Sequence, residues 1–213
     1  MAWGSAMLEL WPRAVVVGFD LVSGVPSVEG CYRVARGDLL EGLPFTDDSF
    51  DFVHQRFLSV GIPLKHWQAA LAELVRVTAP GGWVELVEMS WAPKNAGPAV
   101  QAVAGWGRRL ATLRELDTND VIFLQFQEHL CELGPQDVQR LDVGLPIGEW
   151  AGQRGYWMKR VYSGGFTGIG HAVTARLGIS ERQWQERVEA AMDEVEDRRV
   201  EQLIAFAWGR KPH

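Results

Sequence analysis

The sequence is poor in cysteine and has no long hydrophobic run. Only two of its 213 residues are cysteines, Cys31 and Cys131, and they lie too far apart to form a metal-ligand motif. We therefore expect no metal site, and reduced thiols in a cytoplasmic protein. No stretch approaches the ~20 apolar residues that cross a bilayer, and the N-terminus lacks a basic segment followed by an apolar one. The sequence thus predicts neither a membrane protein nor an exported one.

Positive charge is also scarce. The chain has 21 Lys and Arg against 27 Asp and Glu, for a formal net charge of -6. Because nucleic-acid binding depends on clustered Lys and Arg, we expect no nucleic-acid partner. An apolar fraction of 47% and a charged fraction of 23% are typical of a globular protein, and the length suits one domain over residues 1–213. Oligomeric state has no signature in the sequence.

The first half of the sequence contains a series of short apolar runs, each followed by a turn. Residues 15–19 form a β-branched run that ends at Asp20, which is typical of a strand buried on both faces. Further strands are expected at 32–35, which ends at Gly37-Asp38, and at 49–54. Strands that each end in a turn favour an α/β fold with a parallel sheet.

The middle of the chain alternates between strand and helix patterns. Pro63 suits the first turn of a helix that runs to about residue 78, and Pro80-Gly81-Gly82 ends it before a strand at 83–87. Residues 95–135 are expected to form a helical insertion whose helical pattern, over 99–133, caps the open end of the sheet. Strands are expected again at 138–143 and 200–208.

The segment 149–198 is predicted to combine a loop and helices on the substrate side. Six glycines and several aromatic residues between 152 and 170 predict a mobile surface loop. Ser180 and Gln183 have capping-box spacing, and apolar residues then recur at helical intervals, so a helix is expected to begin there.

Two carboxylates follow successive predicted strands. Asp20 is placed to accept hydrogen bonds from both hydroxyls of a ribose, although it can equally well cap the turn that follows. Asp38 can accept from a purine amino group while a neighbouring backbone N–H donates to the ring. The two acids together favour a nucleotide-type cofactor more strongly than either acid does alone.

Three stretches carry a family resemblance: VVGFD, then GDLLEGLPFTDDSFDFVHQRF, then LAELVRVTAPGGWVELVE. They resemble the middle of class I S-adenosylmethionine-dependent methyltransferases. The later LPIGEW and WGRKP are similar to secondary-metabolism methyltransferases and their LaeA-like regulators. The resemblance covers about residues 3–211. It implies a Rossmann-like α/β sheet with flanking helices and a helical cap insertion, with the first strand missing.

The resemblance also implies S-adenosylmethionine as cofactor and assigns residues to it. Asp20 would hold the ribose diol, and Asp38 with the backbone of Leu39 would hold the adenine. His54, Gln55 and Arg56 would lie beside the methionine part. The implied cofactor residues are Asp20, Leu21, Gly37, Asp38, Leu39, His54, Gln55 and Arg56.

The same resemblance places an acceptor pocket beside the helical insertion and the glycine-rich segment. Its expected residues are Glu88 at the rim, Trp91 and Trp150. For Glu88, as for His54, the alternative is a polar residue satisfied at a strand end. His171 can deprotonate a hydroxyl, but a surface or core histidine is the more common case.

One part of the family pattern is missing. Residues 3–20 align with the helix and second strand that normally follow a glycine-rich motif, so that motif and the strand before it are absent. The missing strand would be central, between the strands at Val15 and Phe50, which would leave unpaired backbone groups on both. The hypothesis is an N-terminally shortened methyltransferase.

The predicted function is transfer of a methyl group from S-adenosylmethionine to a small-molecule acceptor in secondary metabolism. The sulfonium methyl is a good electrophile, so positioning and exclusion of water are the main tasks of the protein, and no catalytic residue is assigned. One alternative is a nicotinamide-dependent Rossmann enzyme, whose ribose Asp20 would also suit. Another is a non-catalytic methyltransferase-like protein that acts through a partner.

Overall fold

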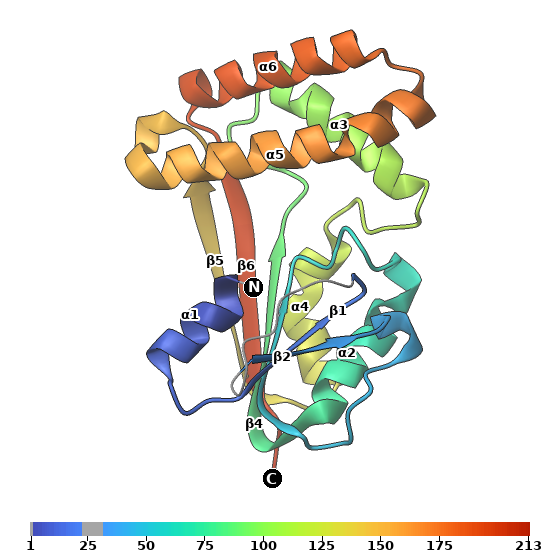
Figure 1. Cartoon of the computed structure of the whole chain (residues 1–213), viewed down its shortest axis with the longest axis vertical. Coiled ribbons are helices and arrows are strands. Elements are labelled where there is room, and N and C mark those ends of the chain that lie inside the picture. The colour runs from blue at the N-terminus through green and yellow to red at the C-terminus, as the bar shows by residue number, and fades with distance from the viewer. Residues whose placement is uncertain (1, 23–31) are drawn as a thin grey trace.

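The computed structural model describes residues 2–22 and 32–213, so Cys31 falls outside it (Figure 1). Cys131 is exposed and carries a free thiol. Within the described ranges, every helix is too short or too polar to traverse a lipid bilayer.

Helices and strands alternate along most of the chain, and short 3-10 turns occur between them. In chain order the elements are α1 (Ala2–Leu10), β1 (Val16–Asp20), β2 (Tyr32–Arg36), η1 (Leu39–Glu41), β3 (Phe50–Arg56), η2 (Leu64–His66), α2 (Trp67–Val77), β4 (Thr78–Met89), α3 (Pro98–Thr112), α4 (Val121–Glu132), β5 (Gln136–Pro146), η3 (Glu149–Ala151), α5 (Gly152–Leu177), α6 (Glu181–Arg198) and β6 (Glu201–Arg210). All six predicted strands are confirmed, with boundaries that shift by up to five residues.

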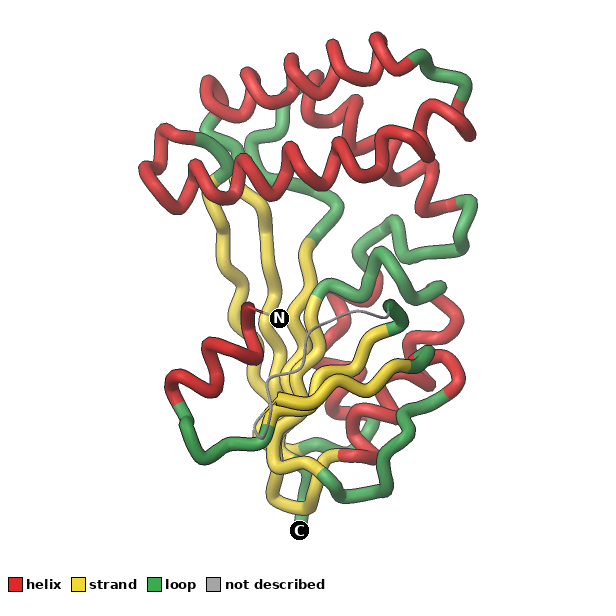
Figure 2. The backbone as a smooth tube through the Cα atoms, in the orientation of Figure 1, coloured by secondary structure: helices red, strands yellow, loops and turns green. Residues whose placement is uncertain are grey.

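The strands form two sheets. β1 and β2 make a parallel pair, and a second sheet has the order β3-β4-β6-β5, in which β6 runs antiparallel to both neighbours (Figure 2). Among the described residues, β1 pairs with β2 alone and β3 with β4 alone. The predicted α/β sheet is therefore present, with two open parallel edges where the resemblance places a central strand.

One face of the four-stranded sheet is covered by α2 and α4. Trp67 and Phe126, from these two helices, have ring centroids 6.2 Å apart and pack over Leu86 and Ala205 of the sheet. Helix α2 has its apolar residues on one stripe, as the sequence predicts, and Pro63 precedes the 3-10 turn before it. This is the main core, and it fixes the positions of β3 and β4.

A second helical layer lies across the far ends of β5 and β6 (Figure 1). It consists of α3, α5 and α6, which bury Val103, Val173 and Val195 against one another. Helix α3 belongs to this layer, whereas α4 packs on the sheet beside α2. Ser180 begins α6 with the predicted capping box. Its hydroxyl accepts from the backbone N–H of Gln183, and the side-chain oxygen of Gln183 accepts from the backbone N–H of Ser180.

The prediction of a mobile loop at residues 152–170 is wrong, because these residues form most of α5, a 26-residue helix. Two of the glycines allow close packing of the helix. A Cβ on Gly155 would collide with the carbonyl oxygen of Gly148, and a Cβ on Gly170 would lie 2.7 Å from Trp184 Nε1. Contacts with the rest of the fold thus outweigh the low helix propensity of glycine.

Candidate active site

The two predicted cofactor carboxylates lie at the same edge of the two-stranded sheet. Asp20 and Arg36 are register partners in parallel strands, and the N–H of Gly37 donates to the backbone oxygen of Asp20 at 3.1 Å. Asp38 follows directly. The stretches that carry the two acids therefore run side by side, as the sequence predicts for the carboxyl ends of neighbouring parallel strands.

Each of these carboxylates caps its own turn through one oxygen. Asp20 Oδ1 accepts from the N–H of Val22 and Asp38 Oδ1 from the N–H of Leu40, both at 2.9 Å. Within the described residues, the Oδ2 atoms accept no hydrogen bond. A surface cavity of about 490 Å³ is bordered by Gly37 and Asp38 but not by Asp20. The capping role is thus present in both acids, and one oxygen of each remains for a ligand.

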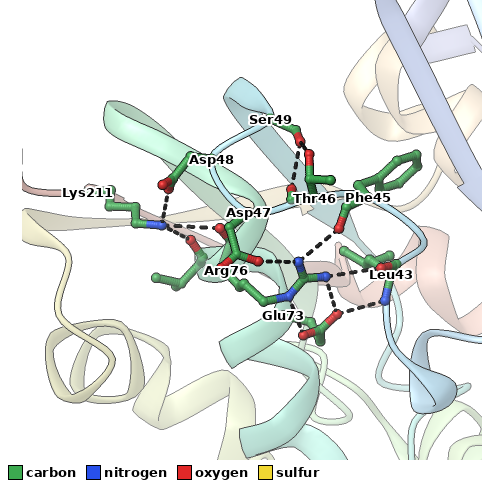
Figure 3. A network of polar contacts seen from close by, with 10 residues as sticks. Leu43, Phe45, Thr46, Asp47, Asp48, Ser49, Glu73, Arg76 and Lys211 are labelled. Carbon is green, nitrogen blue, oxygen red and sulfur yellow. Dashed lines mark hydrogen bonds and ion pairs between the residues drawn. The ribbon is translucent and has the colours of Figure 1, made fainter.

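The turn that follows Asp38 is fixed to α2 by Arg76 (Figure 3). The guanidinium donates to the backbone oxygens of Leu43 at 3.0 Å and Phe45 at 2.8 Å, and pairs with Asp47 at 2.7 Å and Glu73 at 2.7 Å. The Glu73 carboxylate also accepts from the N–H of Leu43 at 2.7 Å. The hydrogen bond from Arg76 is the main reason that the pKa of Glu73 is lowered. This network gives the loop after Asp38 a defined shape.

His54 and Gln55 lie on opposite faces of the four-stranded sheet, as adjacent residues of a strand do. The His54 ring is parallel to that of Trp3 in α1, with centroids 4.1 Å apart, and its Nδ1 is 2.7 Å from a carboxylate oxygen of Glu85. Gln55 is buried on the other face, and Arg56 is exposed, with its guanidinium 5.5 Å from the centroid of the Phe57 ring. These three predicted cofactor residues therefore do not converge on one point.

Glu88, at the carboxyl end of β4, is only 1% exposed. Its Oε1 accepts from the Gln55 amide at 2.6 Å, from the N–H of Ser59 at 3.1 Å and from the N–H of Leu58. Desolvation by burial raises the pKa of Glu88 and outweighs these donors. Glu88 thus fixes the segment that follows β3, rather than standing at the rim of a pocket.

A large apolar cavity of about 590 Å³ lies between α3, α5 and the carboxyl end of β4. Its walls include Trp91 after β4, Leu110 of α3 and Phe166 of α5. Of the three residues expected around an acceptor, Trp91 lines this cavity, Glu88 lies behind its wall and Trp150 lies elsewhere. The indole N–H of Trp150 donates to the backbone oxygen of Ile147 at 2.9 Å.

The cavity also contains polar groups that the sequence did not point to. The hydroxyl of Tyr162 donates to the side-chain oxygen of Gln202, whose amide donates to the backbone oxygen of Ser90 at 2.8 Å. Burial raises the pKa of Tyr162, so its phenol stays neutral. No Asp, Glu, His or Lys occurs among the lining residues that the structure describes, and His171 is exposed outside the cavity. The arrangement suits the orientation of a substrate rather than acid–base chemistry.

Residues that line the cavity from α5 recur at helical spacing. They are Met158, Val161, Tyr162, Gly165, Phe166, Ile169, Ala172 and Arg176. Intervals of three and four residues could have revealed this face from sequence, but the six glycines between residues 152 and 170 obscured it.

Comparisons with known proteins identify similar sequences and folds. Residues 5–86 match a family model described as a methyltransferase domain. The N-methyltransferase verN of Clonostachys rogersoniana is 33% identical over 92 residues, which cover 41% of this chain and 32% of verN. The secondary metabolism regulator laeA of Monascus pilosus is 26% identical over 157 residues, which cover 70% of this chain and 41% of laeA. The chain thus spans about a third to two fifths of the length of these relatives.

A solved structure shares the fold over almost the whole chain. The phosphoethanolamine N-methyltransferase 2 of Haemonchus contortus, in complex with S-adenosylhomocysteine and phosphomonomethylethanolamine, gives a TM-score of 0.57 at 16% identity. The alignment covers 99% of this chain and 47% of that one. The fold is therefore that of the class I S-adenosylmethionine-dependent methyltransferases. Residues 5–86 are thus similar to a methyltransferase domain, and parts of the chain are similar to an N-methyltransferase and to a secondary metabolism regulator.

Proposed function

We propose that this chain binds S-adenosylmethionine at the carboxyl ends of β1 and β2 and transfers its methyl group to a small, largely apolar acceptor in the cavity between α3 and α5. The observation that carries the proposal is the cavity itself. It is apolar, it adjoins the carboxyl end of β4, and its size of about 590 Å³ is within the usual range for small-molecule sites.

The described residues fit the adenosine half of the cofactor. Asp20 and Asp38 lie at adjacent strand ends, each with one carboxylate oxygen available for a hydroxyl or amino donor. The fit to the methionine half is poorer, because Trp3 covers His54 and Gln55 is engaged by Glu88. We therefore assign the ribose to Asp20 and the adenine to Asp38 and Leu39, and leave the roles of His54, Gln55 and Arg56 as predictions.

The chemistry requires little from side chains beyond placement. When bound, S-adenosylmethionine would supply an electrophilic methyl group to a lone pair of the acceptor and would be left as the neutral thioether S-adenosylhomocysteine. The cavity walls exclude water and hold the acceptor in line. The neutral Tyr162 and the lack of an acid or base in the described lining favour an acceptor whose lone pair is already free, with any proton lost to solvent.

Titration calorimetry with S-adenosylmethionine and S-adenosylhomocysteine tests the cofactor site. Binding of both is expected, and Asp38→Ala should weaken it about tenfold or more because a hydrogen bond to a charged group is lost. Asp193→Ala is the matched control, since Asp193 is an exposed acid on α6. If neither ligand produces heat on folded wild-type protein, the proposed function is wrong.

A second candidate is a methyltransferase-like protein that acts through a partner. The stacking of Trp3 on His54 favours it, because the resemblance places the methionine part of the cofactor beside His54. This candidate predicts no binding in the same calorimetric experiment, with either ligand.

A further inference from the structure

The charges around the apolar cavity are all of one sign. Among its described lining residues the charged ones are Arg114 and Arg176, and both are positive. The whole chain has a net charge of -6, so a cavity bordered by two cations and no carboxylate differs from the rest of the protein. Such a site attracts an anion and disfavours a cation.

Neither arginine is neutralised within the described part of the chain. Arg114 donates to the backbone oxygen of Val60 at 3.2 Å, and no carboxylate of residues 2–22 or 32–213 lies within 4.0 Å of Arg114 or Arg176. Elsewhere, two arginines with a structural role are paired with carboxylates, whereas Arg108 and Arg210 donate to backbone oxygens. Arg76 is 2.7 Å from Glu73, and Arg140 is 2.8 Å from Asp142. The two guanidiniums at the cavity therefore keep their capacity to bind a ligand.

Both arginines lie at helix ends that point to the same side of the cavity. Arg176 is in the last turn of α5, and Arg114 follows the end of α3 by two residues. Figure 1 shows the C-terminal ends of these two helices on the same side of the helical layer. Leu110 and Ile169, from the same two helices, provide apolar wall. An apolar body and an anionic group can thus be accommodated together.

We propose that the cavity binds a largely apolar small molecule with one anionic group, which pairs with Arg114 and Arg176. A guanidinium pairs with a carboxylate, a sulfonate or a phosphate through charge-assisted hydrogen bonds, while the apolar walls contribute through burial. That this molecule is the methyl acceptor rests on the proposed function. Its binding to the cavity does not.

Two fluorescent probes with nearly the same ring system test the charge requirement. 8-Anilino-1-naphthalenesulfonate is anionic, and N-phenyl-1-naphthylamine is its neutral counterpart. The double variant R114Q/R176Q should weaken binding of the anionic probe at least tenfold and change that of the neutral probe less than twofold. The matched control is R109Q/R154Q, which removes two exposed charges from the same helices outside the cavity. It should leave both probes unaffected.

A third variant locates the probes. Ala104→Phe adds a ring to the α3 wall and should displace both probes. The proposal is overturned if R114Q/R176Q leaves the anionic probe unaffected, if both probes weaken equally, or if Ala104→Phe leaves probe binding unchanged. The titrations contain no S-adenosylmethionine, so a failed cofactor titration leaves their outcome intact and counts only against the proposed function.

Discussion

The two sheets of this molecule differ in how their strands are covered. β4 lies between β3 and β6 with α2 and α4 over one face, and Leu86 at its centre is completely buried. β1 has one strand neighbour in the described structure, and its residues are half-buried or exposed, although its sequence predicts a strand buried on both faces. The comparison shows that an apolar run is buried only as far as its neighbours allow. It predicts that the β1–β2 pair opens before the larger sheet does.

The largest expected effect comes from making the same substitution in both regions. Phe126→Ala removes a fully buried ring from the core of the four-stranded sheet and should lower the free energy of unfolding by about 4 kcal/mol. Phe19→Ala in β1 removes a half-buried ring that contacts Phe45 and should cost about 1–2 kcal/mol. Urea denaturation measures both.

Native-state hydrogen exchange provides an independent control. Backbone amides of β4 and β6 should exchange only through global unfolding, and those of β1 through a smaller opening. Equal protection of the two sheets, or equal costs of the two Phe substitutions, would contradict the comparison.

A smaller effect is expected at Glu88, which stabilises the carboxyl edge of the four-stranded sheet. Glu88→Ala leaves the buried donors of Gln55, Leu58 and Ser59 without their acceptor and should cost about 3 kcal/mol. Glu88→Gln should cost less, because the amide oxygen can still accept.

The pH dependence of the free energy of unfolding distinguishes the effect of the Glu88 carboxyl group from a simple loss of packing. Burial raises the pKa of Glu88 above its ordinary value of 4.5, so the folded protein holds this proton more tightly than the unfolded chain does. The contribution to stability is therefore present below pH 4.5 and is lost as the pH rises through the folded-state pKa. Glu88→Gln should remove this loss from the pH profile of unfolding. A profile identical to wild type would show that the pKa of Glu88 does not differ between the folded and unfolded states.

The smallest effect is expected in α5, which lies across the end of the four-stranded sheet (Figure 1). No atom lies within 4 Å of a Cβ added to Gly164 or Gly168, so replacement of either by Ala should stabilise the helix by about 0.5–1 kcal/mol and widen the difference between the sheets. Gly155→Ala and Gly170→Ala should destabilise it, because their Cβ atoms would clash. Thermal unfolding followed by circular dichroism measures all four variants. Equal effects at the four positions would contradict the close packing at Gly155 and Gly170.

The strands and the juxtaposition of Asp20 and Asp38 were predictable because they depend on local patterns. Apolar runs that end in Asp20 and Asp38 identify two strand ends, and the parallel-sheet rule then brings the two acids together. Helix α5 was not predictable, since the reason for Gly170 is the indole of Trp184 on another helix. The burial of Glu88 depends on Gln55 across a strand pair, and the Tyr162–Gln202 contact depends on how α5 crosses β6.

One carboxylate oxygen of Glu88, Oε1, contacts two different parts of the molecule. It holds Gln55, in a strand that the family pattern puts beside the cofactor, and also the backbone of Ser59, which forms part of the cavity wall. Strand β3 and the cavity wall are thereby joined through one acceptor atom. A rearrangement of the Gln55 side chain would therefore change the hydrogen bonding that also fixes the cavity wall at Ser59.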